Sequence, residues 1–183
     1  MRLRFLSRNA DKIAEATSIL GAHGINVVAV DFAIDEIQTN DIRVIAKRKA
    51  LEAFKRVGRP LFVEHTGLFL PAIGDLPGGL TQVFWDALEA DRFCEILEPT
   101  GNRSVIAKTA LAYCDGRKIH LFEGEIAGQV PLSPKGDRKF QWDCAFVPEG
   151  YSETFAELGS KKNDISMRKI ALERLVLHLG VKS

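Results

Sequence analysis

The spacing of apolar residues in the first 63 positions constrains the fold of this sequence more than any other feature. Two stretches with helical periodicity, 10–20 and 41–57, alternate with short apolar runs at 3–6, 26–30 and 61–63. When helices and strands alternate in this way, the helices cover the faces of a sheet that contains parallel strands. The opening of the chain therefore predicts an α/β fold.

A β-hairpin is predicted in the middle of the chain. Residues 104–114 and 118–127 favour strands, and the pair Asp115-Gly116 between them favours a tight turn. This antiparallel pair makes the predicted sheet mixed, with helices on both faces. The other expected elements are a loop at 71–79, helices at 83–90 and 92–97, a strand at 142–147, and a final helix from Ser166 to about Leu179.

Length, charge and cysteine content narrow the class of protein. A chain of 183 residues can bury a core as one domain, and we expect a single domain over residues 1–183. The net charge of +1 creates no general attraction to nucleic acid or an anionic membrane, and no apolar run approaches the roughly 18 residues that span a bilayer. Three widely spaced cysteines are typical of reduced thiols, so we expect a cytoplasmic protein.

The first candidate site lies where the first strand meets the first helix. Ser7, Asn9 and Lys12 place a hydroxyl, an amide and an ammonium group there. Because a helix N-terminus has unpaired N–H groups and the positive end of the helix dipole, this junction favours a phosphate. In the alternative interpretation, Ser7 and Asn9 only cap the helix.

Two carboxylate-bearing segments follow apolar strands. Glu36 could hold Mg²⁺, which prefers oxygen ligands and shares them with phosphates, although such acidic loops are more often only solvated. Glu64, His65 and Thr66 stand between the strand at 61–63 and the Gly/Pro-rich loop. This combination offers an acid, a base and a metal ligand within three residues.

Aromatic and basic residues supply the last two candidates. Phe140, Trp142 and Asp143 combine ring faces with a carboxylate, which suits a purine, although a core tryptophan beside a capping aspartate is the alternative. Lys162 and Arg168 could contact phosphates or a base carbonyl, or could belong to a basic helix start at the surface.

Taken in order, these segments resemble the inosine triphosphate pyrophosphatase family. The quoted segments cover nearly the whole chain. They are Ser7-Arg-Asn-Ala-Asp-Lys12, Asp35-Glu-Ile-Gln38, Glu64-His-Thr-Gly-Leu68, Gly74-Asp-Leu-Pro-Gly78, Gly128-Gln-Val130, Phe140-Gln-Trp-Asp-Cys-Ala-Phe146, Thr154-Phe-Ala-Glu157 and Lys162-Asn-Asp-Ile-Ser-Met-Arg168.

The resemblance implies an elongated mixed sheet with two lobes and a central cleft. It also implies a homodimer, dependence on Mg²⁺, and cleavage of deaminated purine nucleoside triphosphates to monophosphate and pyrophosphate. By position, Glu36 and Glu64 would bind the metal. The substrate-binding residues would be Ser7, Arg8, Asn9, Lys12, Thr66, Phe140, Trp142, Asp143, Lys162, Ser166, Met167 and Arg168.

The chain departs from the family pattern at the residues nearest to the chemistry. The family's central Asp is His65 here, the Gly of the first turn is Arg8, and the closing His is Met167; Gln141 and Cys144 replace a Gly and a Pro. Imidazole binds Mg²⁺ poorly, prefers softer metals such as Mn²⁺, and is a competent base near pH 7. The hypothesis is therefore that Glu64 binds metal, His65 activates water and Lys12 completes the catalytic set.

Two functions from different classes remain open from the sequence. The first is an active nucleoside triphosphate pyrophosphatase whose base preference the Met167 and Gln141 changes could alter. The second is a nucleotide-binding or sensor protein that has lost catalysis, and the missing Asp favours it. Nucleic-acid binding is disfavoured because the basic residues form no single stripe.

Overall fold

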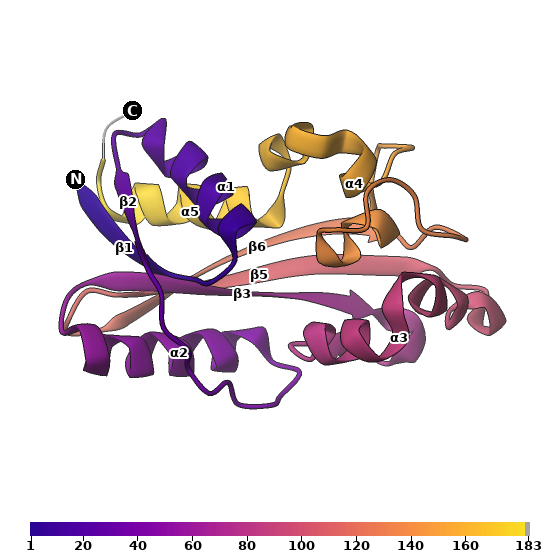
Figure 1. The fold of residues 1–183 in the computed structure, drawn as a ribbon, viewed down its shortest axis with the longest axis horizontal. Helices are drawn as coiled ribbons and strands as arrows, with labels where there is room; N and C mark the ends of the chain where they lie inside the picture. Colours follow the sequence, from indigo (N-terminus) through magenta and orange to yellow (C-terminus); the bar gives the residue numbers. More distant parts are fainter. Residues whose placement is uncertain (182–183) are drawn as a thin grey trace.

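The computed structural model describes residues 1–181 and contains one seven-stranded mixed sheet with helices on both faces (Figure 1). The sheet order is β2-β1-β3-β5-β6-β7, and β4 pairs with β3. The strands are β1 Arg2–Leu6, β2 Asn26–Val30, β3 Leu61–Leu70, β4 Leu76–Gly78, β5 Ser104–Cys114, β6 Ile119–Gln129 and β7 Val147–Pro148. The predicted mixed α/β sheet is confirmed.

Within residues 1–181, five α-helices and four 3-10 helices accompany these strands. The α-helices are α1 Ala10–Gly21, α2 Ile42–Val57, α3 Thr81–Glu95, α4 Phe155–Leu158 and α5 Met167–His178, and the 3-10 helices are η1 Pro71–Ile73, η2 Glu98–Thr100, η3 Gln141–Ala145 and η4 Gly159–Asp164. Asn9, Asp41 and Ser166 accept hydrogen bonds from the first-turn N–H groups of α1, α2 and α5. These caps explain why the three helices begin where the sequence predicted.

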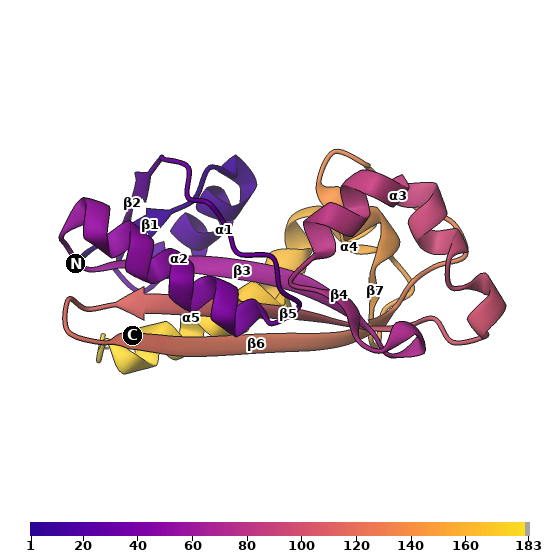
Figure 2. The same ribbon diagram turned by 90° about the horizontal axis from the view of Figure 1, so that it is seen from below.

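The molecule is elongated, and three long strands run along its length. At one end α1, α2 and α5 cover the sheet, and at the other α3 and α4 do so (Figures 1 and 2). β3 pairs with β1 at its start and with β4 at its end, so this one strand belongs to both lobes. Across residues 1–181, no helix combines the length and apolar character that crossing a membrane requires.

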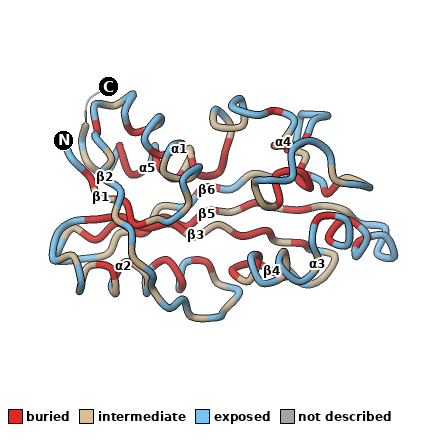
Figure 3. Tube along the Cα trace, viewed as in Figure 1, coloured by how far each residue is buried: buried red, intermediate tan, exposed pale blue. Residues whose placement is uncertain are grey.

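The buried core follows these long strands (Figure 3). Phe62 of β3 packs with α1 and α5, Leu61 and Val63 pack with α2, and Leu68 and Leu70 pack with α3 and the aromatic residues near η3. Each of the three buried clusters therefore contains side chains from β3, and the same strand supports both ends of the molecule.

Several predicted elements differ from the structure. The loop predicted at 71–79 contains η1 and β4, and the helices predicted at 83–90 and 92–97 are replaced by α3, which has a kink at Glu89. The strand predicted at 61–63 continues to Leu70, because β5 pairs with β3 from Leu61 to Phe69, so Glu64, His65 and Thr66 lie inside a strand and not after one. The strand predicted at 142–147 is wrong in most of its length: residues 141–145 form η3, and only Val147–Pro148 pair with β6.

Candidate functional site

Two cavities lie beside α1, and a narrow junction shares residues with the lining of each. The small cavity, of about 270 Å³, lies at the end of β1 beside the N-terminus of α1. The large cavity, of about 500 Å³, lies between α1, the segment before η3, and α4 with η4. The junction between them is lined by residues from both cavities, including Lys12 and Glu15.

The small cavity gathers the predicted phosphate and metal residues. Asn9 caps α1 through its Oδ1, which accepts from the Lys12 amide at 3.0 Å, and Ser7 Oγ accepts from the Asn9 amide at 3.2 Å. Asn9 therefore caps α1, Ser7 holds the amide of this cap residue, and both contacts orient the first turn of α1 at the cavity wall. Together the predicted residues on this wall are Ser7, Arg8, Asn9, Lys12, Glu36 and Glu64.

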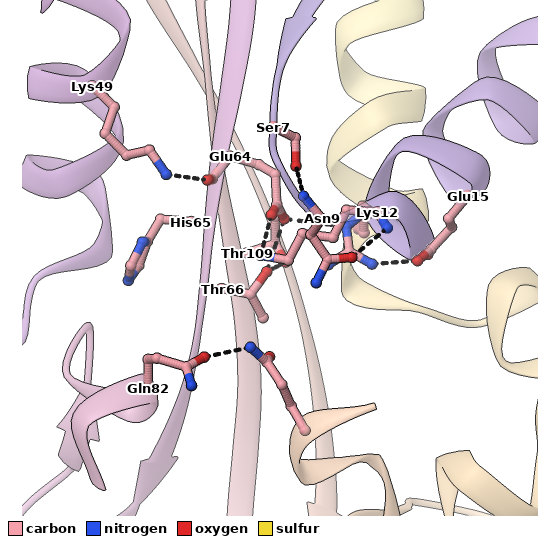
Figure 4. Close-up of polar contacts among 12 residues, drawn as sticks. Ser7, Asn9, Lys12, Glu15, Lys49, Glu64, His65, Thr66, Gln82 and Thr109 are labelled. Carbon is pink, nitrogen blue, oxygen red and sulfur yellow. Dashed lines mark hydrogen bonds and ion pairs between the residues drawn. The ribbon is translucent and has the colours of Figure 1, made fainter. Parts of the chain in front are cut away.

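Glu64 is the centre of a buried ion-pair network (Figure 4). Its side chain is 3% exposed, with Oε1 2.6 Å from Lys12 Nζ and Oε2 3.1 Å from Arg168 Nε. Thr66 Oγ1 donates to Oε2 at 2.9 Å. Burial alone would raise the pKa of Glu64, but the charges of Arg168 and Lys12 outweigh it and hold that pKa well below its usual range.

Glu15 completes the network from the next turn of α1. Its carboxylate pairs with Arg168 and accepts from Ser166 Oγ at 2.6 Å, and both partners are buried. Burial lowers the pKa of Lys12, and the nearby Glu64 carboxylate opposes this shift. Two carboxylates thus face two cations, which keeps these buried charges at the junction paired within the protein.

His65 points to the opposite face of β3 from Glu64 (Figure 4), and it lines neither of the two cavities nor the junction. Its Nε2 lies 2.9 Å from the Gly79 carbonyl oxygen, and its Nδ1 lies 3.4 Å from Glu36 Oε2. The carbonyl can only accept, so Nε2 donates to it. In this arrangement His65 contacts the Glu36 carboxylate, and neither ring nitrogen faces the small cavity.

Glu36 stands at the rim of the small cavity with a 36% exposed side chain. Its Oε1 lies 2.6 Å from Lys49 Nζ. The hydrogen bond from His65, supported by Lys49, lowers the pKa of Glu36. Glu36 is therefore a carboxylate at neutral pH whose position is set by two side chains from the α2 side of β3.

The large cavity contains the predicted aromatic and basic residues. Phe140, Asp143 and Lys162 line it, and Lys162 Nζ lies 3.9 Å from the centre of the Phe140 ring. Lys162 also pairs with the Asp143 carboxylate. Burial raises the pKa of Asp143 to about 6, and the Lys162 charge opposes this shift. The cavity thus combines the Phe140 ring, which Lys162 contacts, with a carboxyl whose pKa is raised to about 6.

Some predicted substrate-binding residues serve the core or the network instead of the open cavities. Trp142 is 4% exposed and packs against Phe146 and Phe155, which matches the alternative interpretation of a core tryptophan. Met167 is also buried, and both residues reach only the junction. The remaining predicted residues at the junction are Thr66, Ser166 and Arg168, and each is hydrogen-bonded within the protein.

Sequence reasoning missed four residues of the site. Glu15 follows Lys12 by three positions on one helix face, and Lys49 is a cation within the apolar series of α2, so both carried a detectable signal. Thr109, whose hydroxyl lies 2.6 Å from that of Thr66, carried none because the pairing register of β3 and β5 brings them together. Gln141, which lines the small cavity, was predicted from the family pattern only to alter the base preference and was not placed among the site residues.

Mg²⁺ binding requires oxygen donors near the phosphates that the ion accompanies. No group of three or more His, Cys, Asp or Glu side chains that could hold a metal ion occurs within residues 1–181. Glu36 and Glu64 nevertheless present carboxylates to one small cavity. Mg²⁺ is commonly held by one or two carboxylates together with substrate phosphates. Glu36 and Glu64 therefore fit a Mg²⁺ ion that the phosphates of a bound nucleotide also coordinate.

Comparisons with known proteins agree with the fold and extend over nearly the whole chain. Residues 3–178 match the Ham1 family. The chain is 36% identical over 177 residues to a dITP/XTP pyrophosphatase of Methanopyrus kandleri, covering 95% of this chain and 94% of that protein. It is 34% identical over 186 residues to an inosine triphosphate pyrophosphatase of Yarrowia lipolytica, covering 100% and 98%. The structure of a HAM1 protein from Coxiella burnetii superposes with a TM-score of 0.84 at 26% identity, covering 98% of each chain.

Proposed function

The chain belongs to the Ham1 family, and we propose that it is a pyrophosphatase that hydrolyses deaminated purine nucleoside triphosphates such as dITP, ITP and XTP. The products are the nucleoside monophosphate and pyrophosphate. The single observation that carries this proposal is the pair of connected cavities. One is lined by a helix N-terminus, Lys12 and Lys49, and the other by the aromatic face of Phe140.

The two cavities suggest how the substrate lies. Phosphates carry dense negative charge and match the small cavity, where Lys12, Lys49 and the first turn of α1 supply positive charge. The base matches the large cavity, where it can stack on Phe140 and present ring N–H groups to Asp143. The sugar and the α-phosphate then occupy the junction beside Lys12.

Hydrolysis of a phosphoanhydride depends mainly on positioning and on neutralising charge as the bond to the leaving pyrophosphate breaks. Lys12 and Lys49 neutralise phosphate oxygens, while Arg168 fixes the orientation of Glu64 through their ion pair at 3.1 Å. Glu36 and Glu64 would hold Mg²⁺, or Mn²⁺ in its place, and a bound ion would add positive charge at the phosphates.

The role of His65 as general base stays a prediction. Its contacts support a different role, because Nε2 donates to Gly79 and Nδ1 faces Glu36. We propose that His65 is a positioning residue that holds the Glu36 carboxylate at the rim of the small cavity, and that it acts on the reaction only through that carboxylate.

Pyrophosphate release from a panel of triphosphates tests the proposed activity. With Mg²⁺ or Mn²⁺, we expect kcat/KM for ITP, dITP and XTP to exceed that for ATP by about tenfold or more, a range that pocket contacts can supply. Equal values for ITP and ATP would refute selectivity for deaminated purines. Tight binding without turnover in either metal would favour the nucleotide sensor instead.

We also propose a homodimer and a cytoplasmic location. The buried, unpaired thiols of Cys94, Cys114 and Cys144 support a reducing compartment. Sedimentation analysis of the purified protein tests the dimer, and a monomer at micromolar concentration would contradict it. Imaging of the tagged protein in its own cell tests the location.

A further inference from the structure

The Gln141 side chain lies where the two cavities meet. Gln141 lines both the small cavity and the junction, and Lys12 is the one other residue in both linings. Its neighbours in sequence, Phe140 and Trp142, also line the junction. If the base and the phosphates of a nucleotide occupy the two cavities, its sugar therefore lies next to Gln141.

The Gln141 amide is hydrogen-bonded to a relay of exposed side chains on α3. Asp86 Oδ1 lies 2.6 Å from Gln82 Nε2, and because a carboxylate only accepts, the nitrogen of Gln82 must face it. Gln82 Oε1 then accepts from Gln141 Nε2. Figure 4 labels Gln82 at this contact. The relay leaves Gln141 Oε1 as the acceptor end of the amide, and no residue within 1–181 donates a hydrogen bond to it.

The backbone around Gln141 is also held in place. Gln141 has φ of 38°, a conformation that residues other than glycine seldom adopt, so the surrounding contacts must maintain it. Three residues earlier, Arg138 forms an exposed bidentate pair with Asp91 of α3, at 2.7 and 3.1 Å. The acceptor oxygen is therefore carried on a segment that is attached to α3 at two points.

We propose that Gln141 Oε1 accepts a hydrogen bond from a ribose hydroxyl of the bound nucleotide, so that Gln141 discriminates among sugars. This inference rests on the proposed function, because the position of the sugar follows from the positions of base and phosphates. Phosphate oxygens at neutral pH offer few donors, whereas the 2′- and 3′-hydroxyls are donors next to the junction. Gln82 is the positioning residue that keeps the acceptor oxygen turned toward the sugar.

The test compares Gln141→Met with the parent on ITP, 2′-deoxy-ITP and 3′-deoxy-ITP. Met keeps much of the side-chain volume and lacks the acceptor. We expect a loss of about three- to tenfold in kcat/KM and in affinity for nucleotides that carry the contacted hydroxyl, and no loss for the one that lacks it. The two deoxy substrates identify whether the 2′- or the 3′-hydroxyl makes the contact.

Three further variants separate this contact from an effect on the backbone. Gln141→Gly suits the positive φ and should show the same change in sugar selectivity, so that result does not depend on how Met is accommodated. Gln82→Leu should give the same pattern with a smaller, roughly two- to fivefold effect, because the amide can then rotate. Arg138→Met loosens the segment without touching the amide and should leave the ratio between sugars unchanged.

The inference is overturned if Gln141→Met lowers activity equally for all three sugars, or if Arg138→Met changes the sugar ratio as much as Gln141→Met does. Equilibrium binding of the same nucleotides keeps the proposed function separate. If the parent binds ITP without releasing pyrophosphate, the proposed activity fails. The ratio of dissociation constants then decides the sugar contact.

Discussion

The two faces of β3 carry charge in different ways, although the residues responsible are neighbours in sequence. On one face the Glu64 side chain is 3% exposed and has Lys12, Arg168 and Thr66 as partners. On the other, His65 contacts Glu36, whose side chain is 36% exposed. Successive side chains of a strand point to opposite faces of the sheet, so Glu64 joins the buried network while the adjacent His65 faces the exposed rim of the small cavity. We therefore expect substitutions on the Glu64 face to have the larger effects on both activity and stability.

The largest effect is expected for Glu64→Gln. The substitution keeps the volume but leaves Lys12 and Arg168 without their shared negative charge. Breaking a buried ion pair by removing one partner costs about 3–5 kcal/mol of stability, and we expect kcat/KM to fall by roughly 10³-fold. Pyrophosphate release and urea unfolding measure the two effects. The matched control is Glu36→Gln on the exposed rim, which should change stability by less than about 1 kcal/mol. Equal destabilisation by both variants would contradict the expectation that the Glu64 face contributes more to stability than the Glu36 rim.

Replacing each of the two lysines of the small cavity compares how much the two faces of β3 contribute to catalysis. Lys12→Met removes a cation from the buried network, and Lys49→Met removes one from the rim beside Glu36. We expect Lys12→Met to lower kcat/KM by about 10²-fold and Lys49→Met by about tenfold, since Lys12 pairs with the buried Glu64, Lys49 pairs with the more exposed Glu36, and preorganised charge contributes more where water is excluded. Steady-state kinetics with ITP measures both. The reverse order would place the phosphate charge nearer the rim than the network.

The pH dependence of nucleotide binding tests Asp143, which lies near Arg168 on the network side. Because burial raises the pKa of Asp143 to about 6, the carboxylate form is lost as pH falls through that value. If the carboxylate accepts a ring N–H of the base, KM for ITP should rise by about tenfold for each pH unit well below 6. Asp143→Asn should flatten this profile. A parent profile that is already flat between pH 5 and 7 would contradict the role.

The same titration affects stability in the opposite direction. The folded protein holds the Asp143 proton more tightly than the unfolded chain does, because its pKa is raised. The stabilising contribution is therefore full below about pH 4 and is lost as pH rises through about 6. Unfolding of the parent and of Asp143→Asn over this range gives the difference. An Asn variant that loses as much stability as the parent on going from pH 4 to 6 would show that another group is responsible.

The smallest effect is expected for His65→Asn. Asn can still donate to the Gly79 carbonyl, and it lacks the second ring nitrogen that faces Glu36. A positioning role predicts a loss of about two- to tenfold in kcat, whereas removal of a general base costs roughly 10²- to 10⁴-fold. Steady-state kinetics with ITP distinguishes these ranges. A loss of 10²-fold or more would restore His65 as the base and require its ring to reach the small cavity during the reaction.

Much of the fold was predictable from the sequence because local signals agreed with it. The strand at 26–30 and the first strand of the hairpin, 104–114, have the bounds that the sequence predicted, and both caps at Asn9 and Ser166 were visible as residue types. These features depend on alternation and capping, which act over a few neighbouring residues.

The extent of β3 and the shape of η3 depend on distant partners. Glu64 and His65 interrupt the apolar pattern, yet β5 pairs with them and cations from α1 and α5 neutralise Glu64. Gly67 is equally dependent on tertiary structure, because a side-chain carbon there would lie 2.2 Å from the Gly78 carbonyl oxygen. Single-residue propensity contains none of this information, so the sequence identified the important residues but placed them after a strand instead of within it.

The three long strands have a consequence for how the protein comes apart. Because β3, β5 and β6 run through both lobes, the two lobes share one continuous sheet, and a cut in the exposed connection η4 between α4 and α5 would leave them joined. Limited proteolysis should therefore release no stable half of the molecule, and the amides along the β3–β5 ladder should exchange with solvent in one cooperative step. Closure around a nucleotide would then come from side chains and short loops at the rim, with the strands serving as a common frame that does not bend.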